Sequence, residues 1–213
     1  MTPALPLGLR IRRTSHREVA KAQDLMVQAL YEVFPEAVLH GGTAVWRCYQ
    51  GSRFSEDVDV YLKKDTEGIE HLFILLEQRG FSIEKRKMTD NALYSLLRLG
   101  RTEVRLEALF KAARGVLREY ETIEGNLITV YTLSAEDIIR EKAAAYLSRR
   151  KVRDLYDIFF LLRQADSSDV KAALAALVGN YKPPLDAGEL RLLILEGAVP
   201  DAERMLAYIK ERA

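Results

Sequence analysis

The sequence has little of what disulfide-bonded, zinc-binding or membrane-spanning proteins need. Its 213 residues include one cysteine, Cys48, and only three histidines. A single cysteine excludes a disulfide framework and a cysteine-based zinc site, and we expect Cys48 to be a small core residue. The histidines are too scattered in the sequence for a zinc site. No apolar run approaches the roughly 18 residues that a membrane span requires.

The composition indicates a folded protein. Hydrophobic residues make up 48% of the chain and charged residues 30%, which is too apolar a mixture for a disordered protein. The first residues, MTPALPLGLRIRR, do not resemble a secretion signal, because their basic residues follow the apolar ones. We therefore expect a soluble, cytoplasmic protein with no membrane association.

The charges nearly cancel in total but are unevenly distributed. Lys plus Arg number 32 and Asp plus Glu 31, a net charge of +1. Residues 85–118 nevertheless carry nine basic residues against three acidic ones, and residues 140–153 carry six against one. If both segments border the same binding site, their basic side chains form a positive rim around it, which would suit a triphosphate and a nucleic-acid backbone.

Hydrophobic periodicity predicts a mixed α and β first part and a helical second part. The first part begins with about twelve residues that we expect to be poorly ordered, and it includes a short apolar stretch over 37–39. The change of pattern predicts two lobes, 1–132 and 133–213. We expect helices over 14–34, 44–49, 66–79, 135–148, 151–164, 168–178, 187–196 and 201–211. We expect strands over 58–62, 82–87, 93–99 and 103–110, and a hairpin of 119–123 with 127–131.

Two short motifs in the first lobe point to phosphate and metal chemistry. Gly41, Gly42 and Thr43 precede a predicted helix, where glycines let the backbone approach a phosphate and the threonine adds a hydroxyl donor. Asp57 and Asp59 lie two apart on a strand and point to the same side. Two carboxylates about 6 Å apart repel by roughly 2–3 kcal/mol, which a divalent cation would relieve. Either motif alone is usually a turn or a strand start, but their combination favours a functional site.

The segment HGGTAVWRCYQGSRFSEDVDVYL resembles the signature of the nucleotidyltransferase superfamily with the DNA polymerase β-like fold, and specifically the AbiEii/AbiGii-type toxin branch. A second motif of that branch, a lysine on one helix and Arg-Asp-x-x-Asp on the next, matches Lys142 and the run from Arg153 to Asp157. The resemblance implies an α+β fold, in which a mixed β-sheet flanked by helices is followed by an α-helical C-terminal lobe.

The same resemblance implies the roles of individual residues. Asp57, Asp59 and Glu107 would be the catalytic and metal-binding carboxylates, although the family often has Asp in place of Glu107. The alternative is that Glu103, Arg105 and Glu107 form a solvated strand face. The residues expected to bind the nucleotide are Gly41, Gly42, Thr43, Arg53, Ser55, Lys142, Arg153 and Asp157.

The helical motif also has a physical interpretation. If the helices over 135–148 and 151–164 stack almost continuously, one stripe contains Lys142, Tyr146, Arg149 or Arg150, Arg153 and Asp157. Arg153 can then pair with Asp157 at i, i+4. Asp154 would cap a helix or pair with Arg150. Tyr146 and Tyr156 would stack on a base or pack in the core, and Ser55 would cap a turn or contact phosphate.

The resemblance predicts a nucleotidyltransferase that binds Mg²⁺, with two ions expected and Mn²⁺ as an alternative metal. It would move an NMP from an NTP substrate to an acceptor hydroxyl and release pyrophosphate. The family implies a toxin of a toxin–antitoxin pair, with tRNA as acceptor and a cognate antitoxin protein as partner. The alternatives are an enzyme that modifies a small molecule or a protein side chain, and an inactive nucleotide-binding module.

Overall fold

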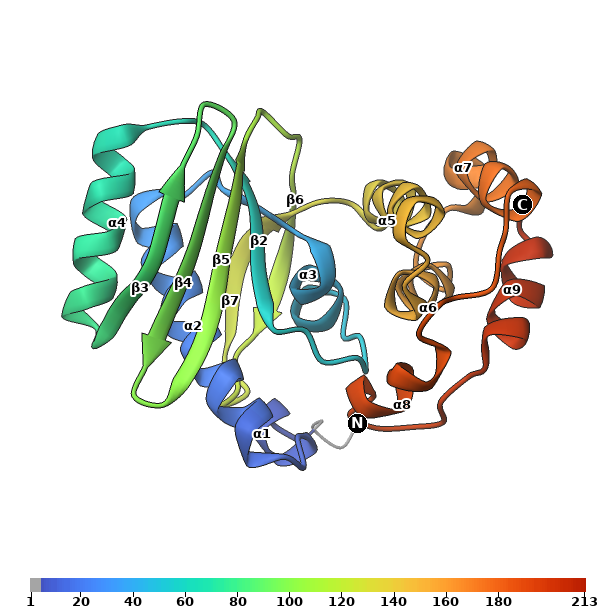
Figure 1. Ribbon diagram of the computed structural model, residues 1–213, viewed down its shortest axis with the longest axis horizontal. Helices are drawn as coiled ribbons and strands as arrows, with labels where there is room; N and C mark the ends of the chain where they lie inside the picture. Colours follow the sequence, from blue (N-terminus) through green and yellow to red (C-terminus); the bar gives the residue numbers. More distant parts are fainter. Residues whose placement is uncertain (1–4) are drawn as a thin grey trace.

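A mixed seven-stranded sheet forms the first lobe. The structure, a computed structural model, describes residues 5–213. The strand order is β3-β4-β5-β2-β1-β7-β6, with β2 parallel to β5 and β1 parallel to β7 (Figure 1). This confirms the predicted α+β class. The strands are β1 (Val38–His40), β2 (Asp57–Leu62), β3 (Phe81–Met88), β4 (Ala92–Leu99), β5 (Thr102–Phe110), β6 (Val116–Glu121) and β7 (Leu127–Thr132).

Two amphipathic helices cover one face of the sheet. In Figure 1, helix α2 (Thr14–Val33) lies behind the strands and helix α4 (Thr66–Gln78) stands beside β3 at the left edge; both end close to where the periodicity predicts. Asp65 begins α4, because its side chain accepts a hydrogen bond from the backbone N–H of Gly68. Each helix buries an apolar stripe against the sheet; these residues include Ala22, Met26, Leu30, Ile69, Leu72 and Leu76.

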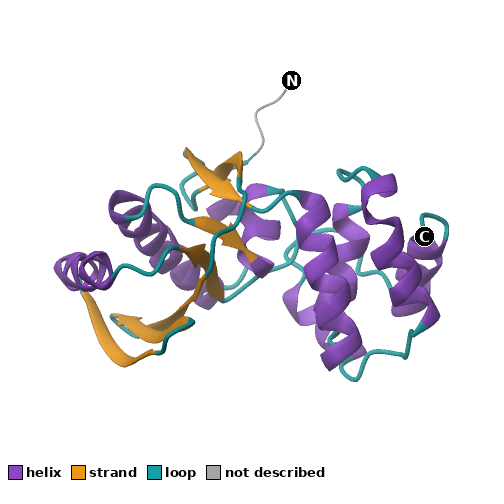
Figure 2. Ribbon diagram, turned by 90° about the horizontal axis from the view of Figure 1, so that it is seen from above, coloured by secondary structure: helices purple, strands orange, loops and turns teal. Residues whose placement is uncertain are grey.

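The segment after β7 is helical and forms a second group beside the sheet (Figure 2). Ser134 caps α5 by accepting a hydrogen bond from the N–H of Asp137. The division into lobes 1–132 and 133–213 stays a prediction. Among the described helices, none has both the length and the apolar character needed to cross a membrane. The elements of this part are α5 (Ala135–Arg149), α6 (Val152–Leu161), α7 (Ser167–Gly179), η1 (Ala187–Glu189), α8 (Leu190–Leu193) and α9 (Ala202–Lys210).

The N-terminal segment is more ordered than the sequence suggests. A short helix, α1 (Leu7–Arg10), stands where we predicted a poorly ordered lead-in, of which residues 1–4 lie outside the described part. Leu7 and Ile11 are buried in a small apolar cluster with Trp46, Phe54 and Ile123. The prediction was wrong because spacing i, i+4 brings these two apolar side chains onto one face, which packs against residues distant in sequence.

The helix predicted over 187–196 is shorter than expected. After α8 the chain becomes extended at Ile194, which forms an isolated antiparallel bridge with Arg53. Phe54 N donates to Leu193 O at 2.9 Å, and Leu195 N donates to Ser52 O at 2.8 Å. Tertiary pairing therefore overrides local helix preference here, and it fixes the loop that carries Arg53.

The β6–β7 hairpin is shifted relative to the prediction. Strand β6 begins at Val116 and ends at Glu121, whereas we predicted 119–123. A turn follows, in which Thr122 N donates to Asn126 O at 2.8 Å and Gly125 adopts φ +87°. The turn therefore takes up Thr122 and Ile123, and the pairing with β7 extends back to Val116 instead.

Candidate active site

Strand register places the three predicted carboxylates together. In the parallel pair β2–β5, Asp57 lies opposite Arg105 and Asp59 lies opposite Glu107. All four side chains therefore point to the same face, which is the face that α2 and α4 leave open. They line a cavity of about 280 Å³ whose other lining residues are Gly42, Arg53, Ser55, Lys142, Arg149 and Arg153.

The glycine pair is required by close contacts at this cavity. Gly41 has φ +68°, and a Cβ at this position would collide with the Asp59 carboxylate. A Cβ on Gly42 would lie 2.5 Å from Arg53 Nη2 and from Ser55 Oγ. Helix α3 (Gly41–Cys48) begins at Gly41, not at residue 44 as predicted, so both glycines belong to its first turn. The free N–H groups of this turn can bind an anion beside Asp59.

Thr43 has a different place from the one predicted. Its side chain is fully buried, and its hydroxyl donates a hydrogen bond to the backbone carbonyl of Asp57. The hydroxyl therefore ties α3 to β2 and does not face the cavity. The prediction that this hydroxyl contacts phosphate does not fit this geometry, since the hydroxyl is bonded to β2 and Thr43 is not among the residues that line the cavity.

We expect Thr43→Val to lower stability and to leave nucleotide affinity almost unchanged. The substitution removes the donor to the Asp57 carbonyl, and leaving a buried acceptor unpaired costs about 1–3 kcal/mol. Thr43→Ser, which keeps the hydroxyl, is the matched control. Thermal unfolding and calorimetric NTP titration measure the two quantities. A tenfold loss of NTP affinity at unchanged stability would show that the hydroxyl binds phosphate after all.

Two of the carboxylates repel each other and resist ionisation. Burial raises the pKa of Asp59 above its usual range, and the charge of Asp57 adds to this against the opposing effects of His40, Lys142 and Arg153. Burial likewise raises the pKa of Glu107, with further contributions from Asp59 and Asp57. Such mutual repulsion is what a bound cation would relieve.

The carboxylates suit a metal ion that is also bound by substrate. Among residues 5–213, no three His, Cys, Asp or Glu side chains lie close enough together to hold a metal. The predicted set of Asp57, Asp59 and Glu107 is therefore not assembled as a closed cage, and Asp57 instead accepts a 2.6 Å hydrogen bond from Arg105 Nε. Mg²⁺ commonly takes one or two carboxylates and completes its shell with water and substrate phosphates, so Asp57 and Asp59 fit it.

A buried ion-pair network lies at the back of the cavity. Asp157 accepts two 2.8 Å hydrogen bonds from Arg53 Nε and Nη2, and it lies 2.9 Å from Lys142 Nζ. Burial alone would raise the pKa of Asp157, but Arg53 and Lys142 outweigh it and hold the pKa below its usual range. The predicted i, i+4 pair of Arg153 with Asp157 is wrong, because Asp157 points to these two cations.

Asp154 extends the network toward the solvent. It is fully buried and accepts 2.8 Å hydrogen bonds from both Arg149 Nε and Arg149 Nη2, and it lies 3.3 Å from Lys142 Nζ. The predicted pair with Arg150 is wrong. Arg150 adopts a left-handed conformation with φ +52°, and its guanidinium donates to the carbonyl of Pro183.

The left-handed Arg150 also changes the arrangement of the helices. It ends α5, and the chain folds back so that α6 packs against α5 and the two do not form one continuous stripe. Lys142, Arg149 and Arg153 nevertheless all line the cavity. Within residues 5–213 the Arg153 guanidinium has no hydrogen-bond or ion-pair partner, and the Arg149 side chain is 46% exposed. These arginines can therefore bind an anionic ligand.

The tyrosines of the helical motif are core residues. Tyr146 and Tyr156 are buried, and the Tyr146 hydroxyl donates to Lys182 O at 2.8 Å while its ring stacks on Tyr181. Of the two roles that we left open, packing therefore fits the structure. Ser55 lies at the cavity beside Gly42, and its contact with phosphate stays a prediction.

Sequence reasoning missed the surroundings of His40. This residue lies opposite Asp59 in the β1–β2 pair, and its ring stacks on Tyr61 with centroids 3.8 Å apart. Its Nδ1 lies 3.4 Å from Glu141 Oε2, so it connects the sheet to α5 beside the carboxylates. The sequence did indicate that His40 lies near the site, because it directly precedes the glycine pair.

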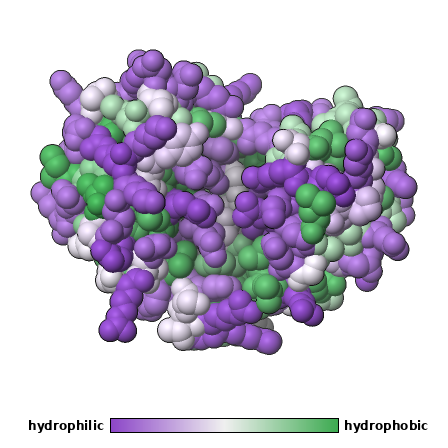
Figure 3. Space-filling view, in the orientation of Figure 1, coloured by the Kyte–Doolittle hydropathy of each residue, from purple (hydrophilic) through white to green (hydrophobic). Residues whose placement is uncertain are grey.

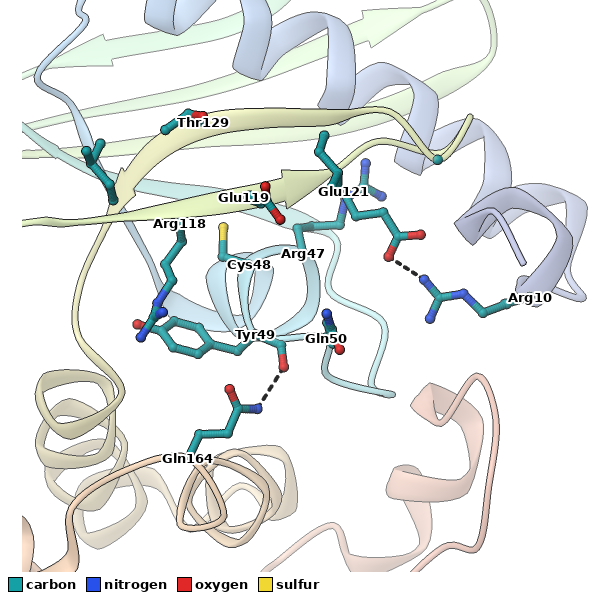
Figure 4. A pocket seen from close by; sticks show the side chains of 13 residues that line it. Arg10, Arg47, Cys48, Tyr49, Gln50, Arg118, Glu119, Glu121, Thr129 and Gln164 are labelled. Carbon is teal, nitrogen blue, oxygen red and sulfur yellow. Dashed lines mark hydrogen bonds and ion pairs between the residues drawn. The ribbon is translucent and has the colours of Figure 1, made fainter. Parts of the chain in front are cut away.

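A larger cavity, of about 790 Å³, lies at the other end of α3 (Figure 4). Arg10 points to Glu121 there, and Gln164 Nε2 donates to Tyr49 O at 2.9 Å. The Arg118 guanidinium lies over the Tyr49 ring, and none of the described residues that line this cavity lies at the N-terminal end of a helix. The smaller cavity is therefore the better candidate active site.

Paired carboxylates on neighbouring strands, a glycine turn at a helix N-terminus and a facing group of cations define a nucleotidyltransferase. Solved structures agree on the fold. MenT4, a nucleotidyltransferase toxin from Mycobacterium tuberculosis H37Rv, matches with a TM-score of 0.67 at 18% identity, over 97% of this chain and 85% of that one. JHP933 from Helicobacter pylori matches with a TM-score of 0.64 at 21% identity, over 94% of this chain and 90% of that one.

The antibiotic-resistance factor ANT(2'')-Ia is more distant, with a TM-score of 0.51 at 17% identity, over 76% of this chain and 92% of that one. The family described as "Nucleotidyl transferase AbiEii toxin, Type IV TA system" matches residues 24–210. The chain therefore belongs to the AbiEii nucleotidyltransferase toxin family. No curated protein sequence matches it.

Proposed function

We propose that the protein transfers an NMP from an NTP to an acceptor hydroxyl in a Mg²⁺-dependent reaction. The observation that carries this proposal is the pair Asp59 and Glu107, whose pKa values are raised beside a glycine turn that can bind phosphate. A bond forms between the acceptor oxygen and the α-phosphorus, the bond from the α-phosphorus to the bridging oxygen breaks, and pyrophosphate leaves.

Each residue of the cavity has a role in this proposal. Asp57 and Asp59 hold the metal, as one ion or two, and Mn²⁺ would serve in place of Mg²⁺. Bound metal would neutralise charge on the phosphates and favour ionisation of the acceptor hydroxyl. Glu107, with its raised pKa, receives the proton of that hydroxyl or holds a second ion. Three groups bind the triphosphate: the N–H groups of α3, Lys142 and the two arginines Arg149 and Arg153.

The resemblance assigns Arg53 and Asp157 to nucleotide binding, but their contacts support a positioning role instead. Both side chains are buried, and they form a bidentate ion pair with each other. We infer that they hold Lys142 at the cavity and do not bind the triphosphate directly.

The acceptor that we propose is tRNA, and the partner is a cognate antitoxin protein. The family description names a toxin of a type IV toxin–antitoxin system, which supports a toxin role and a partner. The basic segments 85–118 and 140–153 both contribute residues to the cavity, which supports a polyanionic acceptor. These substrates would place the protein in the cytoplasm.

Transfer of label identifies the acceptor. The protein is incubated with Mg²⁺ and each NTP labelled on the α-phosphate, together with total tRNA and a protein extract. We expect label in the tRNA fraction. Label in protein or in a small molecule would favour the other acceptors, and NTP binding without any pyrophosphate release would indicate an inactive binding module.

We expect the thermal stabilisation by Mg²⁺ to shrink as the pH falls. At about pH 7.5 protons compete least with the metal for the carboxylates, so the metal should raise Tm by roughly 2–4 °C, equivalent to about 1 kcal/mol. Because the pKa values of Asp59 and Glu107 are raised, protons compete with the metal at a higher pH than for ordinary carboxylates. Unfolding with and without MgCl₂ at about pH 5 and 7.5 measures this. An equal rise in an Asp57→Asn/Asp59→Asn variant would contradict the metal assignment.

A further inference from the structure

One face of the strands β3, β4 and β5 is uncovered and continuous with the carboxylates. In Figure 1, α2 lies behind these strands, and no described helix lies in front of them. Leu93, Leu97 and Leu106 point to the covered face and are buried. Alternation along the strands therefore directs their neighbours in sequence to the open face. Seen from that side, the face is largely hydrophilic with apolar side chains among the polar ones, and it borders the hollow between the lobes (Figure 3).

The strand register aligns residues of β5, β4 and β3 with Asp59 in one row across this face. Asp59 pairs with Glu107, Glu107 with Tyr94, and Tyr94 with Lys87. Neighbouring strands lie about 4.8 Å apart, so Tyr94 lies roughly 10 Å from Asp59. An aromatic ring at that distance is within one to two nucleotides of a hydroxyl held at the carboxylates.

The chemistry of the open face suits a nucleic-acid strand. The Tyr94 side chain is 45% exposed, and Lys85 and Lys87 are exposed beside it. Within residues 5–213, no hydrogen bond or ion pair engages the side chains of these three residues. An exposed aromatic ring flanked by cations is the combination that stacks a base and holds the adjoining phosphates.

The direction of the reaction also assigns this face to the acceptor. The glycine turn and the cations of α5 and α6 lie on the β1 side of Asp59, and we have placed the triphosphate there. In phosphoryl-group displacement, the attacking and leaving oxygens lie roughly in line on opposite sides of the phosphorus. The attacking hydroxyl must then approach from the side away from the leaving pyrophosphate, which is the side of β5 and β4.

We propose that the open face of β3, β4 and β5 binds the single-stranded 3′ end of the RNA acceptor, with Tyr94 stacking on one of its bases and Lys85 and Lys87 contacting its phosphates. This proposal rests on the proposed function, since it takes the carboxylate site as the place of transfer. A protein acceptor would gain little from a stacking ring and two unpaired lysines, so the observations favour RNA.

Fluorescence anisotropy of a fluorescein-labelled single-stranded RNA of about twelve nucleotides tests the surface directly. We expect Tyr94→Ala to raise Kd about tenfold or more, because base–aromatic stacking is lost, and Tyr94→Phe, which keeps the ring, to stay within about twofold of wild type. Lys85→Gln/Lys87→Gln should reduce the slope of log Kd against log salt by about 1.4, equivalent to two phosphate contacts. The charge-matched control is Lys171→Gln/Lys210→Gln, on α7 and α9, which should leave the slope unchanged.

An unchanged Kd in Tyr94→Ala, or an equal loss in the control lysine variant, would overturn the assignment of this surface. Wild-type protein that ignores the RNA and labels a protein instead would overturn it too. Pyrophosphate release by wild type, measured in parallel, distinguishes failure of the proposed RNA surface from failure of the proposed function. If wild type releases pyrophosphate but Tyr94→Ala binds RNA with the wild-type Kd, only the proposed RNA surface is refuted. If wild type releases no pyrophosphate with any acceptor, the proposed function is refuted, and the proposed surface with it.

Discussion

Asp59→Asn will lower the rate of NMP transfer by about 10³-fold or more, because it removes one of the two carboxylates that hold the metal against the α-phosphate. Asp59 is the carboxylate nearest to the glycine turn, since a Cβ on Gly41 would collide with it. It also lies directly opposite Glu107. The asparagine keeps the size of the side chain, so the loss would reflect charge and metal binding and not packing. Pyrophosphate release in the presence of tRNA and NTP measures the rate.

The folded state of this variant provides a control. Asn at position 59 removes the repulsion with Asp57 and Glu107, so the metal-free Tm should be equal to or higher than that of wild type. Glu77→Gln on α4 is the matched substitution, since Glu77 is exposed and lies on neither the carboxylate cavity nor the open face of the sheet. It should leave the rate within about twofold. A rate for Asp59→Asn within tenfold of wild type would remove this residue from the metal site.

The second large effect concerns stability. Asp157→Asn should lower the free energy of unfolding by about 3–5 kcal/mol, because it leaves the buried Arg53 and Lys142 without their shared counter-charge. For a chain of this size the loss corresponds to a Tm lower by roughly 10 °C. Because the pKa of Asp157 is lowered, its contribution is complete above the pKa of an unfolded aspartate, about 4, and is lost as the pH falls below that. Urea unfolding at neutral pH measures it.

A double substitution tests the physical reason. Arg53→Met/Asp157→Leu removes both charges together, and it should recover most of the lost stability since no unpaired partner stays behind. Activity should stay low, because Lys142 loses the nearer of the two carboxylates that position it and keeps only Asp154 at 3.3 Å. If Asp157→Asn alone costs less than about 1 kcal/mol, the network is solvated and does not stabilise the fold.

Local sequence pattern was enough to predict which side chains of one strand share a face, whereas Glu107 joined the carboxylate set through the family resemblance, and the catalytic role of the set stays a prediction. Alternation along a strand puts Asp57 and Asp59 on one face, and the same rule puts Arg105 beside Glu107. The glycine pair was predictable as well, because close backbone approach requires residues without a Cβ. Both features depend on residues within a few positions of one another, where geometry follows directly from the sequence.

The contacts that sequence could not give are those between distant segments. Arg53 and Asp157 are 104 residues apart, and nothing in their local sequence shows that they share a bidentate pair. The same holds for Ile194, which leaves a predicted helix to pair with Arg53. The Thr43 hydroxyl was predicted to contact phosphate, whereas in the structure it donates to the Asp57 carbonyl. A hydroxyl beside a glycine turn can face a ligand or a neighbouring strand, and only the packing of α3 on β2 decides.

The position of phosphorus label tests the central claim most directly. The protein is given acceptor RNA, Mg²⁺ and an NTP labelled either on the α-phosphate or on the γ-phosphate. We predict that the α-label enters the RNA and the γ-label leaves in pyrophosphate, with both signals lost in Asp57→Asn and Asp59→Asn. Transfer of the γ-label to the acceptor, or α-label transfer that survives both substitutions, would contradict nucleotidyl transfer at this site.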